Sequence, residues 1–390
     1  QLMKSRLLAA CFALSCTLPA FSQVTFPVNG TTDPRHTTFA LTGARIFVDY
    51  KTVIDSAILL VRDGRVLDVG KEVVIPKDAV VYPVNGRSIY PSLIDIHSDF
   101  GIPEAKRSEK SEEEAPQFIS NIKGAYGWNQ AVKPEFEAYR VLSFDQKKAE
   151  EFRKLGFGSV VSLSRDGIVR GTSTMVLLGN GRENELFVRD RVAAEFSFDK
   201  GSSTQDYPSS LMGAIALIRQ TYYDAQWYKI CPETKREFNI SLEAFNNNRS
   251  LPQIFEVKNK LSVLRADKIG DEFKTQFIIK GTGDEYQRIN EMKASGADFI
   301  IPLNFPATLD VEDAYNALEV SLEEMKHWEL APTNPAALEK NNIRFALTTS
   351  DLKDKKDFWK NLRKAITYGL SEKQALKALT SIPAEMLGVS

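Results

Sequence analysis

Short runs of hydrophobic residues, separated by turn residues, mark the first part of the chain after residue 40. An Asp63-Gly64 pair between two of these runs is a strong signal for a tight hairpin. The pattern predicts a small antiparallel β unit with strands over 44–48, 56–61 and 65–69. A largely apolar stretch at 88–97 follows and predicts a strand that is buried on both faces.

Beyond residue 117, amphipathic helical stretches alternate with short apolar strands. Such alternation implies parallel strands with covering helices. About 300 residues of it favour an α/β fold of the TIM type, a closed (β/α)8 barrel. We expect helices over 144–155, 209–227, 260–273, 285–295, 335–340, 358–368 and 371–380, and strands over 158–163, 254–257, 276–279, 298–302 and 343–348.

Three other segments are predicted to be irregular. The mixed-charge stretch 102–117 is interpreted as a solvated loop, with a functional lid as the alternative. The stretch 165–173 is interpreted as a turn, with ligand contact as the alternative. Residues 280–284 superficially suggest a phosphate loop, but the full spacing is missing, and a strand-to-helix turn is favoured.

The first 22 residues have the features of a secretory signal peptide. Lys4 and Arg6 precede the apolar run 7–18, and small residues predict cleavage after Ser22. The run is too short for a permanent membrane-spanning helix. A buried N-terminal helix is the alternative. We therefore expect export to the periplasm or the medium, and no membrane attachment after cleavage.

Composition and charge narrow the class of protein. Fifty basic and 51 acidic residues leave a formal charge of −1, so the chain lacks the basic surface of a nucleic-acid binder. Three cysteines and three histidines exclude a four-cysteine zinc module and a multi-bridge disulfide scaffold. Once the signal is removed, Cys231 is the remaining cysteine. We expect a leader arm and small β domain over 23–88 and the barrel over 89–390.

Motifs at both ends of the predicted barrel resemble those of the amidohydrolase superfamily, in particular imidazolonepropionases and dihydroorotases. Residues 90–99, YPSLIDIHSD, are similar to the signature P-G-[LF]-[IV]-D-x-H-x-H that opens the family's barrel. Residues 369–388, from Gly-Leu-Ser to Pro-Ala-Glu-Met-Leu-Gly, resemble its closing motif. The segment before the first motif is similar to the family's N-terminal β-sandwich half.

The resemblance implies a metal-dependent hydrolase of carbon–nitrogen bonds other than peptide bonds. In that family, one or two divalent ions lower the pKa of a bound water. Two ligands come from positions i and i+2 of the first strand, which share one face. Histidines end strands five and six, a carboxylated lysine or a glutamate on strand four bridges two ions, and an aspartate that ends strand eight is the general base.

Residue by residue, the resemblance assigns metal-ligand positions to His97, Asp99 and Glu256. Lys280 takes the place of the strand-six histidine, where it can steady developing negative charge. Asp351, the candidate base, falls one position after the residue that matches the family's aspartate. With Asp351, this ligand set can hold one ion, and its carboxylates suit manganese, magnesium or calcium better than zinc. The expected cofactor is a divalent metal, zinc or manganese.

The same residues can also be interpreted as those of a protein that has lost the catalytic site. In this interpretation, Glu256 and Lys280 form an ion pair, and the lysine supplies the positive charge that a metal ion would otherwise supply. The chain is then a pseudoenzyme, a ligand-binding barrel or a scaffold partner of a second amidohydrolase domain. Asp95 is expected to bond neighbouring backbone rather than to catalyse.

Two kinds of partner follow from these interpretations. A barrel offers a concave site for a small-molecule substrate or ligand. Family members continue past the closing motif with strands that complete the β-sandwich half, and without them the strands over 41–89 keep an open edge. We therefore expect a C-terminal continuation or another chain to cover that edge.

Overall fold

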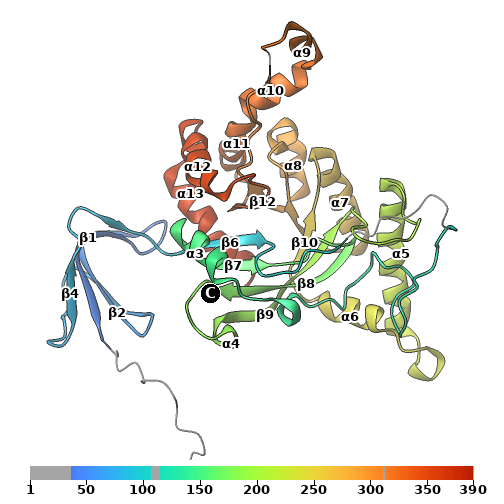
Figure 1. The fold of residues 1–390 in the computed structure, drawn as a ribbon, viewed down its shortest axis with the longest axis horizontal. Coiled ribbons are helices and arrows are strands. Elements are labelled where there is room, and N and C mark those ends of the chain that lie inside the picture. Colours follow the sequence, from blue (N-terminus) through green and yellow to red (C-terminus); the bar gives the residue numbers. More distant parts are fainter. Residues whose placement is uncertain (1–36, 107–114, 311, 390) are drawn as a thin grey trace, which may run out of the picture. The chain divides into compact units, whose positions relative to one another are not determined.

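The computed structural model describes residues 37–106, 115–310 and 312–389 (Figure 1). The predicted signal peptide, residues 1–22, lies outside these ranges. Among the described residues, none of the helices combines the length and the apolar character that a membrane crossing needs. The chain forms two compact units: one holds the described residues up to Ile46 together with Ile54–Ser88, and the other holds Phe47–Val53 together with the chain from Ile89 onward.

A five-stranded sheet organises the smaller unit. Its strands are β1 (Phe39–Phe47), β2 (Val53–Arg62), β3 (Arg65–Gly70), β4 (Val80–Pro83) and β5 (Ser88–Ile89), in the order β3-β2-β1-β4, with β5 also paired to β1. The predicted hairpin is confirmed, since β2 and β3 are antiparallel around Asp63 and Gly64, which both have positive φ. The expectation of a wholly antiparallel unit is wrong, because β4 is parallel to β1. The β2–β3 hairpin lies between these two strands in the chain and lets β4 return in the same direction as β1.

An eight-stranded sheet organises the larger unit. Its strands are β6 (Leu93–Ser98), β7 (Phe157–Ser162), β8 (Val169–Leu177), β9 (Phe187–Ser197), β10 (Gln253–Glu256), β11 (Phe277–Lys280), β12 (Asp298–Pro302) and β13 (Phe345–Thr348), paired in chain order. Neighbours are parallel except at β8, which is antiparallel to both β7 and β9. The segment predicted as a turn over 165–173 is therefore the loop before β8 and the first half of that strand. The loop holds too few residues for a crossover helix, so the chain turns back beside β7.

The larger unit also holds the helices of the described chain, most of which pack around this sheet (Figure 1). They are α2 (Ala138–Val141), α3 (Gln146–Lys154), α4 (Glu183–Leu186), α5 (Leu211–Ile230), α6 (Ile240–Asn248), α7 (Lys260–Phe273), α8 (Ile289–Ser295), α9 (Ala314–Glu319), α10 (Leu322–Leu330), α11 (Asn334–Lys340), α12 (Phe358–Thr367), α13 (Glu372–Leu379) and α14 (Ser381–Met386), with short 3-10 turns at Glu233–Lys235, Glu285–Arg288, Ala331–Thr333 and Lys355–Asp357. The bounds predicted for α7 and β12 are confirmed. The Asn259 side chain caps α7 by accepting a hydrogen bond from the backbone N–H of Ser262 at 2.9 Å.

Both faces of the eight-stranded sheet are buried, which explains why its strands are almost continuously apolar. Adjacent residues such as Ile254 and Phe255 belong to two separate hydrophobic clusters. One cluster packs strand phenylalanines against the covering helices. The other takes one or two residues from each strand and is completed by Ile382 and Met386 of α14. Alternate strand positions therefore serve two cores.

Side chains join the first and last strands of the sheet. Thr348 of β13 donates from Oγ1 to the Asp95 carboxylate of β6 at 2.5 Å and is 3.0 Å from the His97 carbonyl oxygen. The Thr349 hydroxyl also donates to Asp95. The buried Asp95 carboxylate thus ties β6 to β13, and its predicted structural role is confirmed.

Candidate functional site

His97, near the end of β6, is a fully buried neutral imidazole. Its Nδ1 lies 3.2 Å from Ser350 Oγ, whereas its Nε2 is buried and has no hydrogen-bond partner among the described residues. Burial lowers the pKa of His97 to about 3, and the nearby cations Lys280 and Arg165 act in the same direction. The ring therefore stays uncharged at neutral pH, with one nitrogen free to accept or donate a hydrogen bond.

Lys280, the last residue of β11, is a buried cation. Its Nζ donates to Asp351 Oδ2 at 2.6 Å and to the Gly281 carbonyl oxygen at 2.9 Å. Asp351 follows β13 and has φ of 64°, a left-handed conformation that aspartate tolerates better than most residues. This turn at the strand end brings the Asp351 carboxylate to Lys280 despite the offset of one residue from the family pattern. Burial alone would raise the pKa of Asp351, but Lys280 and Arg165 hold it below its usual value.

Glu256, the last residue of β10, contacts two arginines. Arg165 lies in the loop after β7, and Arg170 is the second residue of β8. Each guanidinium pairs with one Glu256 oxygen. Burial would raise the pKa of Glu256, yet Arg170, His97 and Arg165 keep it far below its usual value. Arg165 also lies 2.9 Å from Asp351 Oδ1.

These contacts link five side chains into one ion-pair network, in the order Arg170, Glu256, Arg165, Asp351, Lys280. Three cations face two carboxylates, so the network carries one excess positive charge. The Glu256–Lys280 pair considered from the sequence does not form among the described residues. The two residues are register partners across β10 and β11, but the arginines reach Glu256 and Asp351 reaches Lys280.

A divalent ion does not fit this set of side chains. Among the residues described by the structure, no three or more His, Cys, Asp or Glu side chains gather into a group that could hold a metal. The Glu256 and Asp351 carboxylates are already neutralised by protein cations, and Asp99 is exposed beyond the end of β6. The ligand role predicted for His97, Asp99 and Glu256 finds no support in this arrangement.

Sequence reasoning missed Arg165, Arg170 and Glu195. The arginines lie in the stretch that was interpreted as a turn. Glu195 lies on β9, the fourth strand of the sheet, where the family resemblance expects a carboxylate; it is buried, and its Oε1 has no partner among the described residues. Burial raises the pKa of Glu195 to about 7. A single glutamate inside the apolar run 192–196 was the signal that could have found it.

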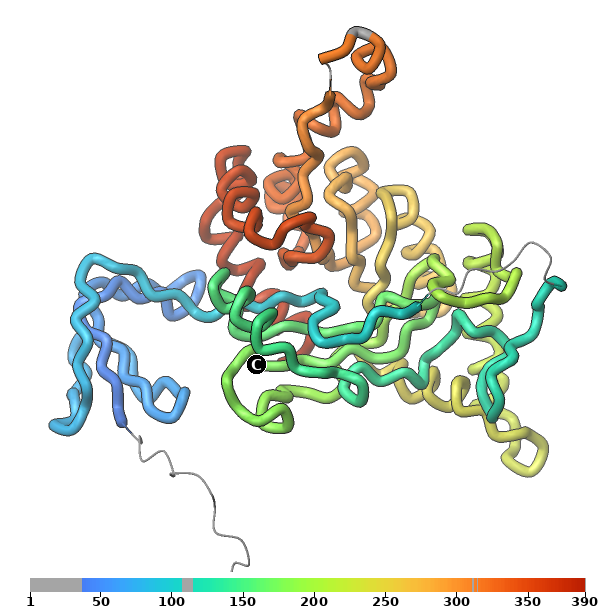
Figure 2. Tube along the Cα trace, in the orientation of Figure 1, coloured from blue at the N-terminus to red at the C-terminus, as the bar shows by residue number. Residues whose placement is uncertain are grey.

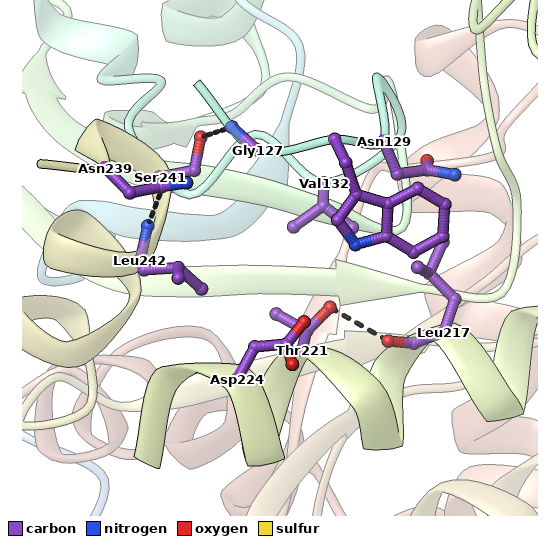
Figure 3. A pocket seen from close by; sticks show the side chains of 10 residues that line it. Gly127, Asn129, Val132, Leu217, Thr221, Asp224, Asn239, Ser241 and Leu242 are labelled. Atoms are coloured by element: carbon purple, nitrogen blue, oxygen red, sulfur yellow. Dashed lines mark hydrogen bonds between the residues drawn. The ribbon is translucent and has the colours of Figure 1, made fainter. Parts of the chain in front are cut away.

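Two hollows lie in the larger unit. A cavity of about 250 Å³ is lined by Lys133, Ser164 and Asp166, together with residues 103–105 that follow β6. Ser164 and Asp166 of this lining are the chain neighbours of Arg165, whose own side chain belongs to the ion-pair network. The second, of about 40 Å³, lies between residues 127–132, α5 and the start of α6, and it has room for only a few water molecules (Figure 3).

Comparisons with known proteins place the fold. No family model matches the sequence, and no curated protein matches it. Among solved structures, an amidohydrolase from Thermotoga maritima MSB8 has a TM-score of 0.66 at 20% identity, covering 90% of this chain and 89% of that chain. A beta-aspartyl dipeptidase from Fervidobacterium islandicum has a TM-score of 0.47 at 14% identity, covering 90% and 88%. The fold of this chain is therefore similar to that of the Thermotoga maritima amidohydrolase.

Proposed function

We propose that this amidohydrolase-like chain binds a small-molecule ligand at the carboxyl ends of the parallel strands of the larger sheet and does so without a catalytic metal. The observation that carries the proposal is the position of Lys280. Its buried ammonium contacts Asp351 at the strand end where the family resemblance expects a metal-binding histidine. A fixed cation there repels a second cation and satisfies the carboxylate that would otherwise need one.

The proposal includes closure of the eight strands into a (β/α)8 barrel. Two features support closure: hydrogen bonds from Thr348 and Thr349 to Asp95 join the end strands, and the second hydrophobic cluster draws on every strand. In such a barrel the ion-pair network lies at the rim that carries the ligand site.

The chemistry around the network favours a small ligand with an acidic group. The network has one excess positive charge, and the side chain of Arg165 is 41% exposed. The cavity of about 250 Å³ offers Phe136 and Val141 as apolar walls, and its Lys133 is paired with Asp166. A small carboxylate with an apolar body would match the exposed Arg165 and these apolar walls.

Ligand binding can be tested by thermal shift with a panel of small aromatic and aliphatic carboxylates. We expect at least one to raise the Tm of the wild-type chain and to lose this effect in Arg165→Gln. Arg219→Gln is the matched control, because Arg219 forms a surface ion pair with Glu272 at 2.6 Å on another part of the unit. Equal shifts in both variants would contradict the assignment of this site.

A metal-dependent hydrolase of carbon–nitrogen bonds is the second candidate. It is favoured by two buried atoms without partners among the described residues, His97 Nε2 and Glu195 Oε1. Metal analysis of protein produced in medium with added zinc and manganese separates the two functions. We expect no stoichiometric metal and a Tm that chelator does not change. Stoichiometric metal that disappears in His97→Ala would instead establish the hydrolase.

We also propose export through residues 1–22 and a partner, either a C-terminal continuation or another chain, that covers the open edge of the smaller sheet. The basic end and apolar run of the first 22 residues support export. The position of β4 at one end of the strand order supports a partner at that edge. Sequencing the mature N-terminus tests export, with Gln23 as the expected first residue.

A further inference from the structure

Two helices, α9 and α10, extend away from the sheet and its covering helices (Figure 2). We refer to residues 312–330 as the arm. None of the arm side chains that the structure describes is buried. Isolated helices shorter than about 12–15 residues are marginal in water, and most helical stability comes from packing. The arm therefore lacks the apolar contacts that normally stabilise helices of this length.

The base of the arm is nevertheless held in place. The ring of His327 stacks on that of Tyr286, with Nδ1 3.1 Å from the tyrosine hydroxyl. Lys260 of α7 contacts Glu323 at 3.3 Å. The Ser321 and Glu324 side chains form a capping box at the start of α10. The arm is thus presented by defined contacts at one end, while its length stays uncovered.

Large apolar side chains are exposed along the arm. The exposed fraction is 81% for Tyr315, 83% for Leu318, 68% for Leu322 and 45% for Met325. The two residues in each helix are three positions apart, so each pair shares one side of its helix. Clustered exposed apolar side chains of this size mark an interaction site rather than ordinary surface.

The charge around these side chains restricts what can cover them. Between residues 310 and 330 there are seven acidic residues and one lysine, and that lysine already pairs with Glu329 at 3.1 Å. A second copy of the arm would bring the same negative charge, and anionic lipid headgroups would be repelled. The acidic residues are Asp310, Glu312, Asp313, Glu319, Glu323, Glu324 and Glu329.

We propose that the arm is a docking site for a basic amphipathic helix of another protein. Its apolar face covers Tyr315, Leu318, Leu322 and Met325, and its lysines or arginines face the surrounding carboxylates. Apolar anchors at helical spacing supply affinity in this mode of recognition, and complementary charge supplies orientation and a fast encounter.

Calorimetric titration of the full chain with a synthetic helix of leucine and lysine, leucines on one face, tests the proposal. We expect saturable binding that weakens with added salt and falls at least about tenfold in Leu318→Ser/Leu322→Ser, since the double variant removes the apolar area that two leucines would bury. Met212→Ser/Ile230→Ser on α5 is the matched control, because these side chains are 79% and 75% exposed. It should bind like the wild type.

Other results would overturn the proposal. Absence of binding, equal loss in both double variants, or equal binding of a peptide with glutamate in place of lysine would each do so. A wild-type dimer in light scattering that is lost in Leu318→Ser/Leu322→Ser would assign the arm to a second copy. Arm-dependent binding to phosphatidylcholine vesicles would assign it to a lipid surface. The substituted residues Leu318, Leu322, Met212 and Ile230 are all exposed. The Tm and the circular dichroism spectrum should therefore be unchanged in every variant.

Discussion

Lys280 Nζ lies 2.6 Å from Asp351 Oδ2, although the two residues are 71 positions apart in the sequence. The lysine is buried at the end of β11. The aspartate follows β13 and reaches the lysine through its own left-handed backbone conformation. The Lys280 charge would not be tolerable there alone, because its side chain is only 1% exposed and a buried ion without a partner loses its hydration with nothing in return. Lys280 therefore depends on Asp351, whose own side chain is 24% exposed.

We predict that Lys280→Met lowers the free energy of unfolding by about 3 kcal/mol, at the low end for a broken buried pair because Arg165 still contacts Asp351. Asp351→Asn, which retains tolerance of the left-handed conformation, should also destabilise by leaving Lys280 buried without a carboxylate. The double variant should lose less than the sum of the two. Urea denaturation measures this coupling, and additive losses would mean that the pair does not interact.

Thr349→Val is predicted to destabilise the chain by about 1–3 kcal/mol, because the buried Asp95 carboxylate loses a hydroxyl donor that ties β13 to β6. Thr367→Val is a suitable comparison, since its hydroxyl bonds the Arg363 carbonyl oxygen on an exposed face at 3.0 Å. Its unfolding midpoint in urea should barely move. Similar losses for both would argue against a special role for the Asp95 bridge.

Glu195 should make stability fall as pH rises. Its folded pKa of about 7 exceeds the ordinary value of 4.5, so between these pH values the folded chain keeps a proton that the unfolded chain has released. The free energy of unfolding therefore decreases by about 3 kcal/mol as the pH rises from 4.5 to 7. Above pH 7 this loss stays constant. Glu195→Gln should abolish this part of the pH dependence in urea titrations. A parallel pH profile for variant and wild type would contradict the assignment.

Gly171→Ala should be among the costliest small substitutions. Gly171 has φ of +81°, and an added Cβ would lie 2.0 Å from the Phe136 carbonyl oxygen. We expect a loss of more than about 2 kcal/mol, combining left-handed strain with a backbone clash. Gly64→Ala isolates the strain, because its φ is +72° with nothing within 4 Å, and it should cost about 1 kcal/mol. Comparable thermal shifts for the two would show that the clash relaxes.

Local patterning was enough to locate most helices and strands of the larger unit. Residues 260–273 and 298–302 have clear apolar periodicity and nearby stop signals, and their bounds match α7 and β12. Strand β8 was missed because Thr172, Ser173 and Thr174 are polar yet buried. These side chains are buried by neighbouring strands of the sheet. The local sequence pattern around residues 172–174 does not include those strands, so it does not reveal the burial.

The candidate site was predictable one residue at a time, but its pairing was not. The family resemblance, matched strand by strand, identified His97, Glu256, Lys280 and Asp351, and all four take part in one set of electrostatic interactions. Their partners depend on where the loop after β7 goes, because Arg165 comes from that loop. Exposure of Asp99 likewise depends on where β6 ends.

The reversed direction of β8 has a consequence for how this site can change over evolution. In a strand of ordinary direction, the first residues would lie at the opposite rim from the ends of β10 and β11. Because β8 is inverted, its Arg170 stands beside those ends, a few residues from Arg165 in the same connection. Both guanidinium groups therefore belong to one hairpin, and a single local insertion or deletion there would remove two of the three positive charges of the network at once.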